Sequence, residues 1–347
     1  MQLRCRYPCV QVWQTDFSQV SPTLLATALL QLQQTDLYHF NPDVLFPLMD
    51  QGPTRLKYLP ILELELVGVE PDTFARACVK LETVELSNLC EQSRHVAALL
   101  GLLATGKTRV RKLLTAGTDL GKVEVEPEVL AKAVIGLEVA TLDSLSSPQV
   151  EALFRIPTKG SRLREVAFYA SDFSTISPRL FSGRLANLTS LDFQYNTTIT
   201  QDHIVALLTA KHSSVRNLVL ANSVDLSGIE PKLLAQKLAL LSRVELNGKN
   251  KLTSGQVVEL FRVLDKKKSS SLEHLSLWGT DLSSVPAAVL GRVANSLLWV
   301  NLSDSSLSCC QLRHILWVTK TKIQVGREQV TLARLVTEPR EVVLARS

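Results

Sequence analysis

Residues 101–108 read GLLATGKT and match the phosphate-binding pattern G-x-x-x-x-G-K-[ST] at every fixed position. A functional loop of this kind needs a strand before it and a helix after it, so that backbone N–H groups and the helix amino end converge on the phosphates. Here residues 95–103 have helical periodicity and residues 109–114 that of a strand. The loop would follow a helix carboxyl end, whose dipole repels anions. We interpret the match as coincidence, and no other motif predicts a cofactor.

A second candidate is a group of thiols and imidazoles towards the carboxyl end. Cys310 and His314 are four residues apart on a predicted helix, next to Cys309 and one repeat after His274. Such a pair could share a metal ion, but no second Cys/His pair occurs at ligand spacing. Small thiols near a helix start also pack well in a core. We therefore predict structural roles for these residues and no metal site.

The composition excludes several other classes of protein. Of the 347 residues, 46% are apolar and 20% charged, which is enough for a packed core and argues against global disorder. The net charge of +5 is modest and does not predict a nucleic-acid-binding protein. No apolar run is long enough to span a membrane, and there is no export signal or disulfide framework, so we expect reduced thiols and a cytoplasmic protein. Catalytic signatures are missing, which predicts that the protein is not an enzyme.

The elements that must position any functional residue belong to a repeat. Leu272, Leu275 and Leu277 form an L-x-x-L-x-L strand motif, Pro286 opens a helix, and the motif starts again at Leu297. Because aromatic residues make up only 5% of the chain, we expect an aliphatic core. The clear copies of the motif start at Leu56, Leu81, Val110, Leu137, Leu163, Leu188, Val215, Leu241, Leu272 and Leu297.

Alternate repeats agree better than neighbours in how their helices begin. Every second unit has a proline-led helix, at Pro71, Pro127, Pro178, Pro231 and Pro286. The units between them mostly begin their helices with polar residues, as at 92–93, 200–202, 254–256 and 308–309, whereas Ser147-Pro148 breaks the division. The pattern therefore predicts a two-unit alternation.

Units of 25 to 31 residues, counted between the motif starts, that alternate in this way resemble the ribonuclease-inhibitor-like subfamily of leucine-rich repeats. That subfamily also supplies the sensing domains of NOD-like innate immune receptors and the Ran GTPase-activating proteins. The resemblance implies an α/β leucine-rich-repeat solenoid, a right-handed horseshoe with a parallel sheet on the concave face and helices on the convex face. We expect residues 1–318 to form an array of about 12 units, the first two irregular, and residues 319–347 to form a carboxyl-terminal cap.

The sequence departs from the family at the ninth position of the unit, where the family often has Asn or Cys. Small hydroxyl side chains can still reach backbone groups at the turn, so we expect a weaker ladder of hydrogen bonds and the same fold. The residues at this position in the clearer copies are Thr118, Ser171, Asn196, Ser223, Thr280 and Ser305.

The predicted concave face is the most promising functional surface. Its charges alternate in sign, and it carries four large aromatic residues although the chain has few; exposed Tyr, Trp and Arg are frequent anchors of protein interfaces. The alternative is that these rings only lie flat over neighbouring strands. The predicted partner-binding residues are Tyr169, Tyr195, Arg216, Arg243, Trp278, Trp299 and Asp304.

The sequence thus predicts a monomeric, non-catalytic scaffold that binds another protein through its concave face. Two alternatives follow from the resemblance: an activator of a small GTPase, or a ligand-sensing fragment of an innate immune receptor. The acidic tail typical of the Ran-activating proteins is missing, since the chain ends EPREVVLARS. Nucleic-acid sensing is a weaker alternative.

Overall fold

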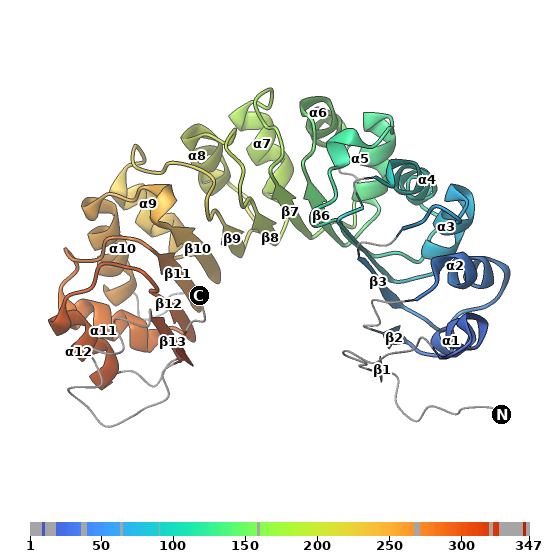
Figure 1. The fold of residues 1–347 in the computed structure, drawn as a ribbon. Coiled ribbons are helices and arrows are strands. Elements are labelled where there is room, and N and C mark those ends of the chain that lie inside the picture. The colour runs from blue at the N-terminus through green and yellow to red at the C-terminus, as the bar shows by residue number, and fades with distance from the viewer. Residues whose placement is uncertain are drawn as a thin grey trace. The chain divides into compact units, whose positions relative to one another are not determined.

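A computed structural model describes residues 9–10, 19–35, 40–62, 65–89, 91–157, 160–266, 271–318, 322–325 and 343–344. The chain divides into two compact units, Met1–Thr175 and Ile176–Ser347, and each is described by itself. In both units a strand is followed by a helix, and the next strand pairs in parallel with the one before it (Figure 1).

In the first unit the strands pair in chain order, with helices over one face of the sheet (Figure 1). Its elements are β1 (Cys9–Val10), α1 (Pro22–Leu29), β2 (Gln34–Thr35), α2 (Pro42–Gln51), β3 (Tyr58–Leu62), α3 (Pro71–Cys78), β4 (Thr83–Ser87), α4 (Ser93–Leu103), β5 (Lys112–Leu114), η1 (Leu120–Lys122), α5 (Pro127–Ile135), β6 (Val139–Asp143), α6 (Ser147–Arg155) and β7 (Glu165–Tyr169).

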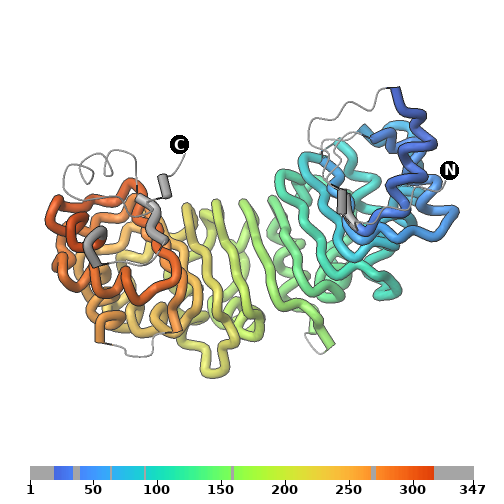
Figure 2. The backbone as a smooth tube through the Cα atoms, turned by 90° about the horizontal axis from the view of Figure 1, so that it is seen from below, coloured from blue at the N-terminus to red at the C-terminus, as the bar shows by residue number. Residues whose placement is uncertain are grey.

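The second unit repeats the arrangement, and its successive coils lie side by side in Figure 2. Its elements are α7 (Pro178–Leu185), β8 (Ser190–Asp192), α8 (Gln201–Thr209), β9 (Asn217–Val219), α9 (Pro231–Leu238), β10 (Arg243–Asn247), η2 (Gly248–Asn250), α10 (Ser254–Lys266), β11 (His274–Trp278), α11 (Ala287–Ser296), β12 (Trp299–Asn301), α12 (Cys309–Val318), β13 (Lys322–Val325) and β14 (Val343–Leu344). The last two strands, β13 and β14, continue the parallel ladder into the segment predicted as a cap. The rest of residues 319–347 lies outside the described residues.

The strand motif supplies the core, as predicted. Leu275, Leu277, Val300 and Leu302 are all buried between sheet and helices, and Leu163, which is half-buried, is the exception among the motif starts. Each unit is therefore a stack of leucine-rich repeats, with a parallel sheet on one side and helices on the other. The predicted fold class is confirmed.

The expectation of an aliphatic core is wrong in part. Phenylalanines are among the largest fully buried side chains, and they contact one another both between and within repeats; the Phe46 and Phe74 ring centroids, in neighbouring repeats, are 4.9 Å apart, and those of Phe168 and Phe173, in one repeat, are 5.2 Å apart. The rings pack edge to face, a favourable arrangement for their quadrupoles.

Each strand ends in a turn in which the eighth residue of the repeat has a left-handed backbone conformation. In most repeats that residue has a positive φ, for example 58° at Asn88, 72° at Gly117 and 63° at Tyr195. The ninth residue then reaches a turn carbonyl in most of the clearer repeats, either in the preceding repeat or, as at Ser223, in its own, whereas the buried Thr280 Oγ1 has no hydrogen-bond partner among the described residues. Ser305 Oγ donates to the Leu277 carbonyl oxygen at 2.8 Å, and Thr118 Oγ1 donates to that of Leu86 at 3.2 Å.

In the longest repeat, which starts at Leu241, an asparagine lies one position later than in the other repeats, at residue 250. Asn250 is buried, and its Nδ2 donates to the carbonyl oxygens of Leu220 at 2.7 Å and Val224 at 2.9 Å. It therefore performs the role that the hydroxyls perform elsewhere, with two bonds in place of one.

The two-unit alternation has a structural cause. The third residue of every second helix is a buried Gln or His that donates to a carbonyl in the loop leading into the proline-led helix before it. Gln256 Nε2 donates to the oxygens of Leu226 and Ile229, both at 2.7 Å, while its Oε1 accepts from the Thr253 N–H at 2.8 Å. The equivalent residues, which we call the latch residues, are His95, Gln149, His203, Gln256 and Gln311.

The latches join helices in pairs. Helix α9 packs more closely on α10 than α10 does on α11, and α11 packs most closely on α12. The proline-led helix needs no such residue because its first turn lacks one N–H donor and has a preset φ. The structural unit of the array is thus two repeats.

Replacing Gln256 by Leu should lower the free energy of unfolding by about 2–4 kcal/mol, since the Ile229 carbonyl and the Thr253 N–H lose their hydrogen bond to Gln256 and the Leu226 carbonyl keeps only the one from the Ile229 N–H. Urea unfolding followed by circular dichroism measures the change. Ser254→Ala, an exposed change in the same helix, should shift stability by less than about 0.5 kcal/mol. Equal stability of Gln256→Leu and the native protein would contradict the latch.

Candidate protein-binding face

On the second unit, the sheet face opposite the helices carries a row of polar and aromatic side chains. Parallel pairing aligns Arg243 with His274, and His274 with Trp299. Because neighbouring strands are about 4.8 Å apart, these side chains are in contact range of one another. The ring centroids of His274 and Trp299 lie 6.4 Å apart at an interplanar angle of 39°. Arg243 is exposed, and the two rings are half-buried.

A second aromatic group lies where the strands end. Trp278, the last residue of β11, is 43% exposed, and its indole Nε1 donates to Asp304 Oδ2 at 2.6 Å. Asp304 follows β12 at the left-handed turn position, with φ 56°. The indole ring is therefore held in one orientation by a charge-assisted hydrogen bond and still presents apolar surface to solvent.

Tyr195 occupies the same left-handed turn position, in the repeat that directly follows α7. Its side chain is 59% exposed, and its φ of 63° is unfavourable for a bulky residue by about 1–2 kcal/mol. The buried Asn196 holds the turn in place through its Nδ2, which donates to the Gln194 carbonyl oxygen at 3.2 Å. An exposed tyrosine in a left-handed turn is a strained position that leads to a functional hypothesis.

The two predicted arginines differ in their charge environment. Arg243 forms an ion pair with Glu245 on its own strand, with Nε donating to Oε1 at 2.7 Å. Arg216 is exposed before β9, its Nη1 donates to the Val215 carbonyl oxygen at 3.3 Å, and it forms no ion pair with the described residues. Among the described residues, Arg216 therefore has no opposite charge beside it, whereas Arg243 is paired with Glu245.

Tyr169 belongs to the first unit, unlike the other predicted site residues. It is half-buried at the end of β7, where parallel pairing sets it beside Asp143. Asp143 Oδ2 in turn accepts from the Gly117 N–H at 2.7 Å. Within the second unit the structure brings together Trp278 with Asp304, and Arg243 with Trp299 through His274.

Sequence reasoning missed His274 as a surface residue because it weighed the histidine only as a metal ligand. It occupies the third position of its unit, the same position as Trp299, so repeat alignment would have found it. Tyr58 occupies the same third position and was also missed; its hydroxyl contacts Glu85 Oε2 on the open face of the first unit.

The interpretation of Cys309 and Cys310 as core residues is wrong. Both are exposed in the first turn of α12, whereas Gln311, Leu312 and Ile315 of the same helix are buried. The described residues contain no cluster of three metal-binding side chains.

The phosphate-loop match has the reversed order that the sequence predicts. Helix α4 precedes the loop and β5 follows it, and Gly106, at φ 69°, ends the helix. The loop therefore meets the carbonyl end of α4, and its N–H groups do not form an anion cradle.

No protein-family model matches the chain, and no curated protein sequence matches it. Among solved structures it is similar to the leucine-rich-repeat-containing protein LegL7 from Legionella pneumophila, with 16% sequence identity, a TM-score of 0.42, and coverage of 96% of this chain and 99% of that chain. The fold assignment rests on the repeat geometry described above. Among the described residues, every helix is too short or too polar to cross a bilayer.

The cysteines should differ in reactivity. Cys78 is fully buried in α3, and burial raises the pKa of its thiol well above the ordinary value, whereas Cys309 and Cys310 are exposed. Peptide-resolved labelling with iodoacetamide should modify Cys309 and Cys310 in the native protein and Cys78 only after denaturation. Labelling of native Cys78 at the rate of Cys309 would show that the α3 core is open.

Proposed function

We propose that this protein is a non-catalytic scaffold that binds another protein through the open sheet face of its second unit. The observation that carries the proposal is the exposed Trp278 indole, fixed by its hydrogen bond to Asp304. A ring that is already ordered loses little conformational entropy when a partner covers it, so more of its buried area contributes to affinity. Aromatic rings of this kind are common interface hot spots.

The surroundings of Trp278 support the same function. Tyr195 is held outward by a strained turn, and Trp299 and His274 form a second ring pair on the same sheet. Arg216 adds an unpaired charge, which contributes to orientation and association rate. The surface combines an apolar centre with polar neighbours, which is the usual anatomy of a protein interface.

The alternation of proline-led and latched helices supports membership of the ribonuclease-inhibitor-like subfamily of leucine-rich repeats. We infer a monomeric protein, because a repeat array of this kind needs no second copy to complete its core. We also infer a cytoplasmic protein, because the free, exposed thiols of Cys309 and Cys310 are typical of a reducing compartment.

The test is capture of partners by the immobilised full-length protein, followed by mass spectrometry and measurement of affinity. The double variant Trp278→Ala/Tyr195→Ala should lose affinity for the captured partner by roughly 100-fold or more, since each hot-spot ring contributes about 2 kcal/mol.

Leu24→Ala is the matched control, because Leu24 is a similarly exposed apolar side chain in the first unit. Its affinity for the partner should equal that of the native protein. An unchanged affinity of the double variant, or hydrogen-exchange protection confined to the helices, would refute the proposal.

A further inference from the structure

The position just before the first leucine of the repeat differs between the two units. In the first unit the residues at this position are mostly basic, and in the second unit none is. They are Arg55, Lys80, Arg109, Gly136 and Arg162 in the first unit and Asn187, Ser214, Leu240, Ser271 and Ser296 in the second.

The three arginines occupy equivalent places in the backbone ladder. The N–H of each donates to a carbonyl oxygen of the preceding repeat: Arg55 to Leu30 at 3.0 Å, Arg109 to Val79 at 3.2 Å and Arg162 to Ile135 at 3.2 Å. They are two strands apart, and neighbouring strands are separated by about 4.8 Å, so successive arginines are anchored about 10 Å apart. We call them the arginine row.

Other charges on this edge are already satisfied. Lys57 pairs with Glu82 at 3.1 Å, and Lys80 Nζ donates to the last carbonyls of α2 and to that of Gly52. At the equivalent positions of later repeats, Arg111 pairs with Glu138 at 3.5 Å. The arginine row is exposed, by contrast, and forms no ion pair with any residue that the structure describes.

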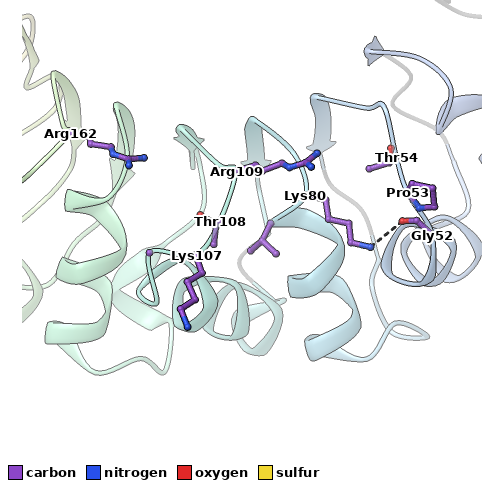
Figure 3. A pocket seen from close by; sticks show the side chains of 10 residues that line it. Gly52, Pro53, Thr54, Lys80, Lys107, Thr108, Arg109 and Arg162 are labelled. Carbon is purple, nitrogen blue, oxygen red and sulfur yellow. Dashed lines mark hydrogen bonds between the residues drawn. The ribbon is translucent and has the colours of Figure 1, made fainter.

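The row borders a furrow at the edge of the sheet. A cavity of 640 Å³ is lined by Arg109, Arg162 and Thr108, and an adjoining cavity of 330 Å³ by Arg55; the two share Thr54, Lys80 and Arg109. Figure 3 shows the Arg109 and Arg162 side chains along the same edge, while Lys107 points the opposite way, past the helices. None of the described residues that line either cavity is aromatic.

We propose that the arginine row binds an extended acidic segment of a protein partner. A guanidinium group accepts a carboxylate in a two-bond geometry, which suits arginine better than lysine. In a polyproline II segment, with three residues per turn and a rise of about 3.1 Å, every third side chain lies on one face at intervals of about 9 Å. That interval matches the spacing of the row.

The same observations disfavour a nucleic acid as the ligand. Single strands are bound by aromatic platforms on which bases stack, and the furrow has none.

The probe is a fluorescent peptide of repeating Glu-Pro-Pro triplets, titrated with the full-length protein at low ionic strength and followed by anisotropy. Binding should weaken with added salt. Arg55→Gln, Arg109→Gln and Arg162→Gln should each lower affinity about 5–10-fold, the loss of one charge-assisted pair. A peptide of the same composition with its glutamates contiguous should bind more weakly, because its carboxylates do not match the row.

Arg94→Gln is the matched control, since Arg94 is an exposed arginine on α4 of the same unit. It should bind the peptide like the native protein, and so should Trp278→Ala, which separates this proposal from the proposed function. Circular dichroism verifies that each variant is folded. The proposal is overturned if the peptide does not bind, if Arg94→Gln weakens binding equally, or if single-stranded oligothymidine binds the row more tightly than the peptide.

Discussion

The structure depends on burial of the repeat's aliphatic strand residues against the coils on either side. No single repeat has a core of its own; Leu275 and Leu277 are removed from water only because β10 and β12 lie beside β11. Burial alone would leave several turn carbonyls with at most one backbone hydrogen bond, and an unsatisfied buried carbonyl costs about 1–3 kcal/mol. Most of the ninth-position side chains, Asn250 and the latch residues supply the additional bonds, so the apolar and polar parts of the core form together.

Sequence periodicity predicts this fold because each strand start recurs at a nearly constant interval and each helix starts at a recognisable residue. It also predicts correctly that the Gly-Lys-Thr of residues 106–108 follows a helix. The hydrogen-bond partners of Gln256 could not be predicted, because Leu226 and Ile229 lie a full repeat away and the polar residue alone does not tell which carbonyl it reaches. The exposure of Cys309 and Cys310 depends on how the first turn of α12 is rotated, which spacing near a helix start does not determine.

The candidate surfaces were predictable to different degrees. Position within the unit was enough to assign Trp278 and Trp299 to the sheet face, but the bond between Trp278 and Asp304 depends on a left-handed turn. His274 and the arginine row became visible only when equivalent positions were compared across repeats. The same backbone geometry therefore presents different side chains in the two units, since residues outside the core vary without changing the stacking.

The latch residues also constrain how such an array can change its length. Each latch residue lies on the second helix of a pair and donates to carbonyls in the loop that leads into the first, proline-led helix. Gln311, for example, donates to the carbonyl oxygens of Leu282 and Val285. Deleting one repeat would place two helices of the same kind together and strand a donor or its acceptors in the interior. Duplications and deletions of repeats that preserve folding should therefore add or remove two repeats at a time. The double repeat is then the module that is inherited in this architecture.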